Sequence, residues 1–216
     1  MDRKLHDMKE AKHEQLNKEK FNKWADTFDD KSLRTAYLQD AQCKLLPLLD
    51  VKENVIFVDI GCGTGRALEE AAKLVNLKGL FYGVDLAEKM IEKARSNFHG
   101  KHNFHFLQAN AESIPLNDNF FDIIICTHSF HHYLNPDKAL SQMHRLLKKN
   151  GRLYILDTNA DHWIIHIIDK IIKLLQPAHV KFYSTEEFRQ LFEQAGLIYV
   201  HSRKINVGSK VHIGEK

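Results

Sequence analysis

The segment Val55-Ile56-Phe57-Val58-Asp59-Ile60-Gly61-Cys62-Gly63-Thr64-Gly65 decides the fold of this chain. Its first half is rich in β-branched residues and predicts a buried strand. The alternating glycines that follow predict a tight turn, and the apolar spacing from Arg66 to Leu74 predicts a helix. Glycines in such a turn let the backbone approach a ligand closely, which indicates a cofactor that contains a nucleoside.

Two cofactors are compatible with a turn of this kind. A dinucleotide site has the pattern G-x-G-x-x-G, whose third glycine allows the helix and the strand to pack closely. Arg66 occupies that third position here, and Gly65 comes one residue too early. Asp59 would repel a pyrophosphate, whereas it would attract the ammonium group of S-adenosylmethionine (SAM). The residues therefore favour SAM, and an NAD-dependent oxidoreductase is the alternative.

The pattern D-x-G-x-G-x-G from Asp59 to Gly65 resembles the first motif of the class I SAM-dependent methyltransferases. The similarity covers about residues 21–200. The resemblance implies a Rossmann-like domain that binds SAM and releases S-adenosyl-L-homocysteine after methyl transfer to a small-molecule acceptor. A non-catalytic module that binds SAM is a further alternative, because no sequence motif guarantees turnover.

The resemblance also implies which residues surround the cofactor. Asp85 ends the second strand, where a carboxylate can accept hydrogen bonds from both ribose hydroxyls. Asn110 stands where the family usually has an acid that accepts from the adenine amino group, and its amide oxygen can still accept that bond. The residues expected around the cofactor are Trp24, Phe28, Asp59, Gly61, Cys62, Gly63, Gly65, Asp85, Leu86, Met90, Asn110, Ala111, Glu112, Thr127 and His128. For Met90, Trp24 and Phe28, ordinary core packing is an equally good interpretation.

Three histidines follow the fourth expected strand and are candidates for the reaction itself. The segment from Cys126 to Leu134 resembles one found in many small-molecule methyltransferases, and it lacks the N-P-P-aromatic sequence of enzymes that methylate nucleic-acid bases. Imidazole titrates near neutral pH, so His128, His131 and His132 are candidate general bases, with His132 preferred from the resemblance. A structural role is an alternative for each. Because the segment has no H-E-x-x-H and no acid at ligand spacing, we expect no metal site.

Length and composition limit the other classes of function. The 216 residues suffice for one sizeable core, and 31 Lys and Arg against 28 Asp and Glu give no basic surface for nucleic acid. Cys43, Cys62 and Cys126 have no C-x-x-C spacing, and free thiols suggest the cytoplasm. No signal peptide is expected at the N-terminus, and the apolar cluster Trp163–Leu175 is too short and too charged to span a bilayer. We expect a monomer or a homodimer.

The periodicity of the chain predicts alternating strands and helices. Strands are expected at Val55–Ile60, Leu80–Asp85, Phe104–Ala109, Phe121–Thr127 and Arg152–Asp157, and helices at Arg66–Val75, Glu88–Phe98 and Pro136–Lys148. A helix at Trp163–Leu175 follows, for which core packing is the default interpretation and a lid or a dimer face are the alternatives. Ser184 and Glu187 then predict a capping box, and Leu197–Ile205 with Lys210–Ile213 a closing hairpin.

These elements predict an α/β fold with a doubly wound, mostly parallel sheet. It carries a C-terminal antiparallel hairpin and an N-terminal helical cover. We expect a single domain with a charged helix or flexible tail at residues 1–20, the helical cover at 21–50 and the cofactor-binding core at 55–157. A lid or substrate-side helix at 158–183 and the closing helix and hairpin at 184–216 complete it.

Overall fold

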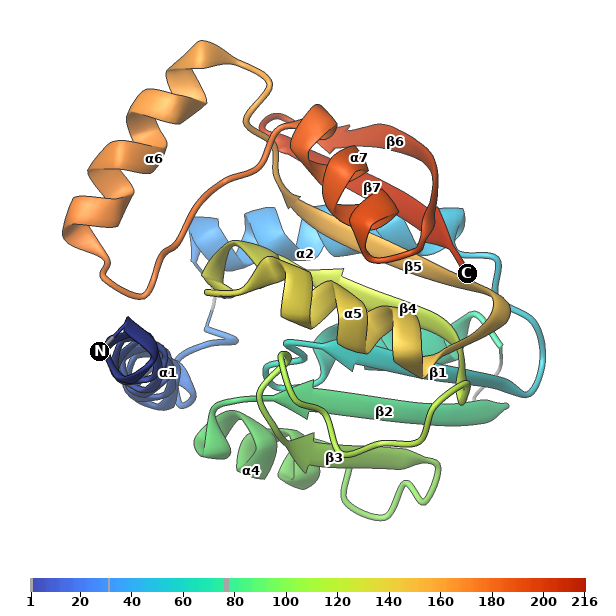
Figure 1. The fold of residues 1–216 in the computed structure, drawn as a ribbon. Helices are drawn as coiled ribbons and strands as arrows, with labels where there is room; N and C mark the ends of the chain where they lie inside the picture. Colours follow the sequence, from blue (N-terminus) through green and yellow to red (C-terminus); the bar gives the residue numbers. More distant parts are fainter. Residues whose placement is uncertain (1, 31, 76–77) are drawn as a thin grey trace.

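The computed structural model describes residues 2–30, 32–75 and 78–216 (Figure 1). The structure does not describe residue 1 of the expected N-terminal segment, residue 31 of the expected helical cover, or residues 76–77 of the expected core. The helices are α1 (Asp2–Trp24), α2 (Leu33–Leu45), α3 (Arg66–Lys73), α4 (Glu88–Asn97), α5 (Pro136–Leu146), α6 (Trp163–Leu175) and α7 (Thr185–Gln194). Two short 3₁₀ turns are η1 (Leu46–Leu48) and η2 (Phe130–His132). The strands are β1 (Val55–Ile60), β2 (Gly79–Asp85), β3 (Phe104–Gln108), β4 (Phe121–Thr127), β5 (Leu147–Thr158), β6 (Ile198–Asn206) and β7 (Ser209–Glu215).

The strands form one sheet in the order β3-β2-β1-β4-β5-β7-β6. The first five run parallel, and β7 pairs antiparallel with both β5 and β6. This confirms the predicted doubly wound, mostly parallel sheet with a C-terminal antiparallel pair. The strand order reverses between β1 and β4, and in open parallel sheets ligands bind at the carboxyl ends of the strands beside such a point.

Alternate residues of the central strands pack on opposite faces of the sheet. Phe57 lies in the core that also contains Leu68 of α3, whereas its neighbour Val58 lies in the core that contains Leu140 of α5 and Phe188 of α7. Both faces of the central strands are therefore covered. This double burial explains the continuous apolar run of β4, which a strand with one face in water would not need.

Several predicted helix and strand ends shift by one or two residues, the predicted break between the fifth helix and the fifth strand is wrong, and a predicted cap is confirmed. The expected gap between the fifth helix and the fifth strand does not exist: α5 ends at Leu146, and β5 begins at once with the buried Leu147, which pairs with Phe121. A register shift between Phe121 and Ile123 in this pairing accommodates the extra residues of β5. The capping box is present, since the Ser184 hydroxyl accepts from the backbone N–H of Glu187 and the Glu187 carboxylate accepts from that of Ser184.

Helix α6 shows that core packing, the default interpretation of its apolar sequence, was wrong. No residue of α6, all of which the structure describes, is buried. Trp163 is 72% exposed and Leu174 is 84% exposed. The helix lies beyond the carboxyl ends of the strands, on the same side of the sheet as α1 (Figure 1). Among the described residues, no helix is both long enough and apolar enough to cross a membrane.

His212 of β7 makes the stability of the fold sensitive to acid. Its ring is fully buried, lies 4.0 Å from the Phe188 ring between centroids, and its Nδ1 is 3.0 Å from the Tyr199 hydroxyl. Burial, with a contribution from the charge of Lys210, lowers the pKa of His212 from 6.5 to about 3. Between these two values the unfolded chain binds a proton that the folded chain does not, so stability falls as the pH falls.

We therefore expect the free energy of unfolding to be highest above about pH 6.5 and to drop by about 2–3 kcal/mol between pH 6.5 and 4.5, at about 1.4 kcal/mol per unit. Urea unfolding across this range measures the slope. His212→Phe should reduce the slope without abolishing it, because the buried His132 also has a lowered pKa, while His201→Ala, at an exposed histidine of β6, should leave it unchanged. An acid slope in His212→Phe equal to that of the wild type would contradict this assignment.

Candidate active site

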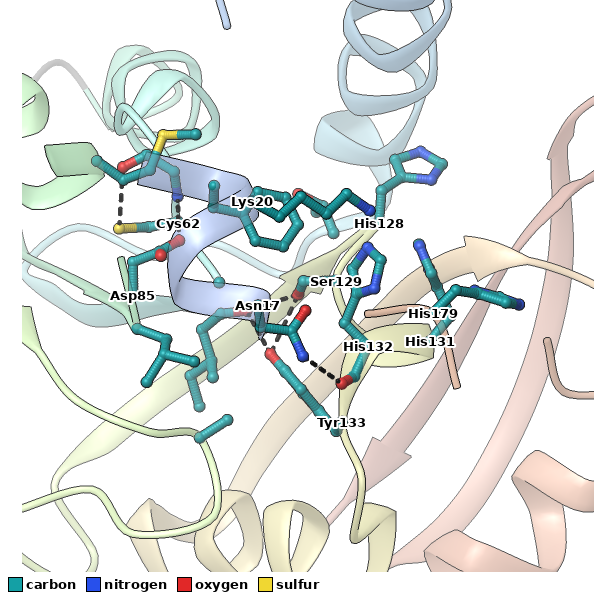
Figure 2. A pocket seen from close by; sticks show the side chains of 18 of the residues that line it. Asn17, Lys20, Cys62, Asp85, His128, Ser129, His131, His132, Tyr133 and His179 are labelled. Carbon is teal, nitrogen blue, oxygen red and sulfur yellow. Dashed lines mark hydrogen bonds between the residues drawn. The ribbon is translucent and has the colours of Figure 1, made fainter. Parts of the chain in front are cut away.

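A cavity of about 600 Å³ lies at the carboxyl ends of β1, β2 and β4. The glycine turn after β1 forms one wall, the segment after β4 forms another, and α1 closes the cavity from outside (Figure 2). Of the residues that the sequence singled out, those that line it are Trp24, Phe28, Gly61, Cys62, Gly63, Asp85, Leu86, Met90, Asn110, Ala111, Glu112, Thr127, His128, His131 and His132. Asp59 and Gly65 are absent from the described lining.

The three glycines of the turn have left-handed backbone conformations, with φ of +84° at Gly61, +53° at Gly63 and +87° at Gly65. Side chains other than hydrogen are strained at such angles. A Cβ at Gly65 would lie 2.8 Å from the Phe98 ring, so this glycine serves packing rather than lining the cavity. A Cβ at Gly63 would instead meet the Phe28 ring at 3.3 Å, beside the cavity. Gly63 is thus the position of the turn where a side chain would take up ligand space.

Asp85 at the end of β2 holds this turn in place. Its two carboxylate oxygens accept hydrogen bonds from the backbone N–H groups of Gly63 and Ala87, each at 2.9 Å, and Figure 2 shows Asp85 beside the turn. Burial raises the pKa of Asp85 despite these bonds. A carboxylate has about four acceptor positions, so the backbone bonds leave capacity for a hydroxyl donor in the cavity.

Asp59 lies beneath the turn, where only 1% of its surface is exposed. Its Oδ1 atom has no hydrogen-bond partner within the described part of the chain. Burial, followed by the charge of Asp85, raises the pKa of Asp59 well above its ordinary value. Asp59 is not in the described wall of the cavity, so a cationic ligand there would interact with this carboxyl only across the turn.

The aromatic end of α1 covers the side of the cavity next to Asp85. Met90 is 1% exposed and packs with Ala25, Trp24 and Phe28 in a small cluster of its own. Met90 also lines the cavity. The two interpretations of these residues are therefore compatible, because the same side chains both pack together and form an apolar wall for a flat ring.

Asn110 and Glu112 have protein partners in addition to their place in the lining. The Asn110 amide donates to the Glu14 carboxylate of α1 at 3.0 Å, and its oxygen accepts from the N–H of Glu112 at 2.9 Å. The Glu112 carboxylate accepts from the backbone and the side-chain amide of Asn135 at 2.9 and 2.7 Å. Both residues thus tie α1 and the start of α5 to the cavity.

The three candidate histidines do not share one environment. His131 Nδ1 donates to the Asp157 carboxylate at 2.7 Å, and His132 Nδ1 donates to the carbonyl of Ala178 at 2.8 Å. Burial, with the charges of His131 and Lys20, lowers the pKa of His132 well below its ordinary value. His128 has a positive φ of 52°, and its ring centroid lies 6.0 Å from that of Tyr37 of α2.

The face of α1 from Glu10 to Lys20 is a part of the site that was not predicted from the sequence, whereas Trp24 at the end of the helix was. One face of this charged helix lines the cavity, through Glu10, His13, Glu14, Asn17, Lys20, Phe21 and Trp24. His13 Nε2 lies 2.8 Å from the carbonyl of His132, and the Lys20 ammonium donates to Gln176 at 2.9 Å. The spacing of three and four residues was visible in the sequence, but the stripe is polar, and we sought only apolar stripes.

Two further residues of the site come from the C-terminal half of the chain and were not predicted. Asp157 at the end of β5 is 2% exposed in its side chain and holds His131. His179 follows α6, is 1% exposed in its side chain, and donates through Nε2 to the Asp169 carboxylate at 2.7 Å. Neither belongs to a motif, so only the three-dimensional structure brings them to the cavity.

Comparisons with known proteins agree with this geometry. A family model described as "Methyltransferase domain" matches residues 51–196. The uncharacterized methyltransferase YcgJ of Bacillus subtilis is 32% identical over 154 residues, which cover 69% of this chain and 60% of YcgJ. The ubiquinone/menaquinone biosynthesis C-methyltransferase UbiE of Yersinia pestis is 32% identical over 154 residues, covering 65% of this chain and 61% of UbiE.

Among solved structures, a SAM-dependent methyltransferase from Aquifex aeolicus superposes with a TM-score of 0.71 at 25% identity, covering 90% of this chain and 97% of that chain. The curated relatives are longer: this chain spans 60% of the length of YcgJ and 61% of that of UbiE.

The glycine turn gives a first test of the cofactor site. We expect Gly63→Val to lower the affinity for SAM at least 100-fold, because the added side chain would fill the space beside Phe28. Calorimetry with SAM and with S-adenosyl-L-homocysteine measures this loss. Gly100→Val is the matched control, since Gly100 has a similar φ of +81° but no described atom within 4 Å of its Cβ position. SAM affinity within a factor of two of the wild type in Gly63→Val would place the cofactor elsewhere.

Asp85 gives a second test, directed at the ribose hydroxyls. Each hydrogen bond to a charged group contributes about 1.5–3 kcal/mol, so Asp85→Ala should weaken SAM binding by about 10-fold or more. Because Asp85 also holds Gly63, the variant is compared on two ligands: S-adenosyl-L-homocysteine and its analogue without ribose hydroxyls. The loss should be large for the first and small for the second. Equal losses for both ligands would assign Asp85 to the turn alone.

Proposed function

Since the chain belongs to the methyltransferase domain family, whose cofactor is SAM, we propose that it transfers the methyl group of SAM to a small-molecule acceptor. The observation that carries this proposal is the continuity of one cavity from the glycine turn and Asp85 to a group of imidazoles. When bound, SAM supplies a methyl group already activated on a sulfonium, which an acceptor atom can displace in line.

The two sides of the cavity suit different ligands. Gly63, Asp85 and Met90 lie on the side that we assign to the cofactor. The acceptor side is formed by His131, His132 and their surroundings, across the cavity from Asp85 (Figure 2). A nucleophile held there would face the cofactor side, and alignment of two bound reactants can supply about 7–11 kcal/mol of the barrier.

Helix α1 supports the same reaction by shielding it from water. Its aromatic residues Phe21 and Trp24, and Phe28 just after it, line the cavity, and Lys20 reaches across to Gln176 just beyond α6. Exclusion of water strengthens the electrostatic interactions inside such a site. The chain thus contributes to the reaction mainly by binding SAM and the acceptor, orienting them and enclosing them away from water.

We assign proton removal from the acceptor to the imidazoles, first to His132 and then to His131 and His128. The lowered pKa of His132 keeps its ring neutral at pH 7, and the hydrogen bond to Ala178 leaves Nε2 as the nitrogen that can accept a proton. Asp157 holds His131 in the same tautomer. A positioned general base contributes about 10²–10⁴-fold to the rate.

Several features support a small acceptor. The cavity volume of about 600 Å³ suits a small molecule. Charge is nearly balanced, with 31 basic and 28 acidic residues, which disfavours a nucleic-acid substrate. UbiE, one of the similar proteins, is named for ubiquinone and menaquinone biosynthesis, and a ring-containing acceptor would suit the aromatic side chains that line the cavity. The three cysteines, all within the described ranges, are free thiols, which supports a cytoplasmic enzyme, as a monomer or a homodimer.

His132→Ala tests the assignment of the imidazoles. Turnover is measured as release of S-adenosyl-L-homocysteine in the presence of a panel of hydroxyl, amine and thiol acceptors. We expect a decrease of 100-fold or more with unchanged SAM affinity. In the wild type, the rate should begin to fall only below about pH 6.5, because the pKa of His132 is lowered and a base must be deprotonated.

His166→Ala, at an exposed histidine of α6, is the matched control and should retain full turnover. Normal turnover in His132→Ala would remove this residue from the reaction. SAM binding without turnover on any acceptor by the wild type would favour a binding module over an enzyme.

A further inference from the structure

The acceptor side of the cavity contains three imidazoles that come from two separate segments. His131 and His132 follow β4, and His179 follows α6. One nitrogen of each ring lies within 4.8 Å of the others. The ring centroids of His131 and His132 are 4.1 Å apart, and those of His131 and His179 are 5.4 Å apart. All three rings line the cavity (Figure 2).

Each of these rings is held through one nitrogen by an oxygen behind it. Asp157 accepts from His131 Nδ1, the Ala178 carbonyl accepts from His132 Nδ1, and Asp169 accepts from His179 Nε2, at 2.7, 2.8 and 2.7 Å. In the described part of the chain, the second nitrogen of each ring makes no hydrogen bond. Metal-binding histidines have this arrangement, because a carboxylate or carbonyl behind the ring fixes its tautomer and raises its basicity.

The electrostatics of the cluster also suit a cation. Histidine binds a metal through the lone pair of its neutral ring, and a carboxylate behind the ring favours the bound cation. The carboxylates of Asp157 and Asp169 lie directly behind two of the rings. Their two negative charges outnumber the positive charge of Lys20, the lysine of α1 that lines the same cavity.

We propose that His131, His132 and His179 bind one divalent transition-metal ion of the zinc class and leave its fourth position open to the cavity. Zinc takes imidazole nitrogens at about 2.0–2.1 Å, which places them about 3.4 Å apart in a tetrahedral site. One nitrogen of each ring already lies within 4.8 Å of the others, about 1.5 Å more than this spacing. Three histidines with one open position make a reactive site rather than a structural one.

This site differs from the expectation of no metal drawn from the sequence. That expectation considered only His128, His131 and His132, which lack an acid at ligand spacing. In the structure the third histidine of the cluster is His179 rather than His128. The carboxylates that hold the rings come from Asp157 and Asp169, which lie far along the chain from His131 and His132. The open position faces the side assigned to the acceptor, so the ion would coordinate an oxygen, nitrogen or sulfur of that molecule. In the metal-loaded chain the free nitrogens of His131 and His132 are ligands rather than bases, and the ion would take over their role by lowering the pKa of the coordinated acceptor group. This use of the ion rests on the proposed function, whereas ion binding itself does not.

The experiment is a titration of the chelator-treated full chain with Co²⁺, followed by visible absorption, and with Zn²⁺, followed by calorimetry. We expect one ion per chain and the intense visible bands of a four-coordinate cobalt site. His131→Ala, His132→Ala and His179→Ala should each weaken binding at least 100-fold. Asp169→Asn, which keeps all three ligands, should weaken it about 10- to 100-fold. His166→Ala, at the exposed histidine of α6, should bind as the wild type does.

The proposal is overturned if neither ion binds, or if His179→Ala binds as tightly as the wild type, or if His166→Ala loses the ion equally. SAM binding, measured by calorimetry on each variant, shows that the variant is folded. Where an alanine variant does not fold, the ion affinity of Asp169→Asn is the test, and an affinity equal to that of the wild type overturns the proposal. Ion binding without methyl transfer would contradict the proposed function alone. Methyl transfer by a protein that binds neither ion would contradict the metal site alone.

Discussion

The hydrogen bonds between β2 and the glycine turn are the constraint on which the rest of the site depends. Asp85 accepts from Gly63 and Ala87, and the carbonyl of Val84 accepts from Gly61 and Cys62 at 2.7 and 3.0 Å. These bonds hold the turn in left-handed conformations that only glycine adopts without strain. They also require a buried carboxylate, whose desolvation is offset by the backbone donors. The position of β2 beside β1 therefore determines the shape of the cofactor side.

The two sides of the cavity differ in how their residues are distributed along the sequence. The cofactor side comes mostly from short segments that directly follow β1, β2 and β3, so a local motif describes it. The acceptor side joins α1, the segment after β4 and the residues around His179. Contacts such as the one between His13 and the carbonyl of His132 link residues more than a hundred positions apart. A motif can therefore indicate the class of cofactor, while the shape of the acceptor side depends on the complete fold.

The parts of the structure that could be predicted from the sequence are likewise those that depend on local segments. Strands β1 and β4 were predicted to the residue, because a strand buried on both faces has a continuous apolar sequence that ends sharply. The inner face of α1 was missed, since its stripe is polar and resembles a solvated surface. The exposure of α6 was also missed, because an apolar sequence does not specify what covers it. His179 could not be predicted at all, as nothing near it in sequence indicates that His131 and His132 lie beside it.

The long-range contacts of α1 affect how the chain folds during its synthesis on the ribosome. Synthesis runs from the N-terminus, and domains fold as their segments emerge. Helix α1 is made first, yet its partners Gln176 and the carbonyl of His132 are made much later. The end of α1 has earlier partners, since Phe21 and Trp24 pack with Met90 of α4. The contacts of His13 and Lys20 wait for the segment after β4 and for Gln176, so the enclosed cavity is among the last features that translation completes.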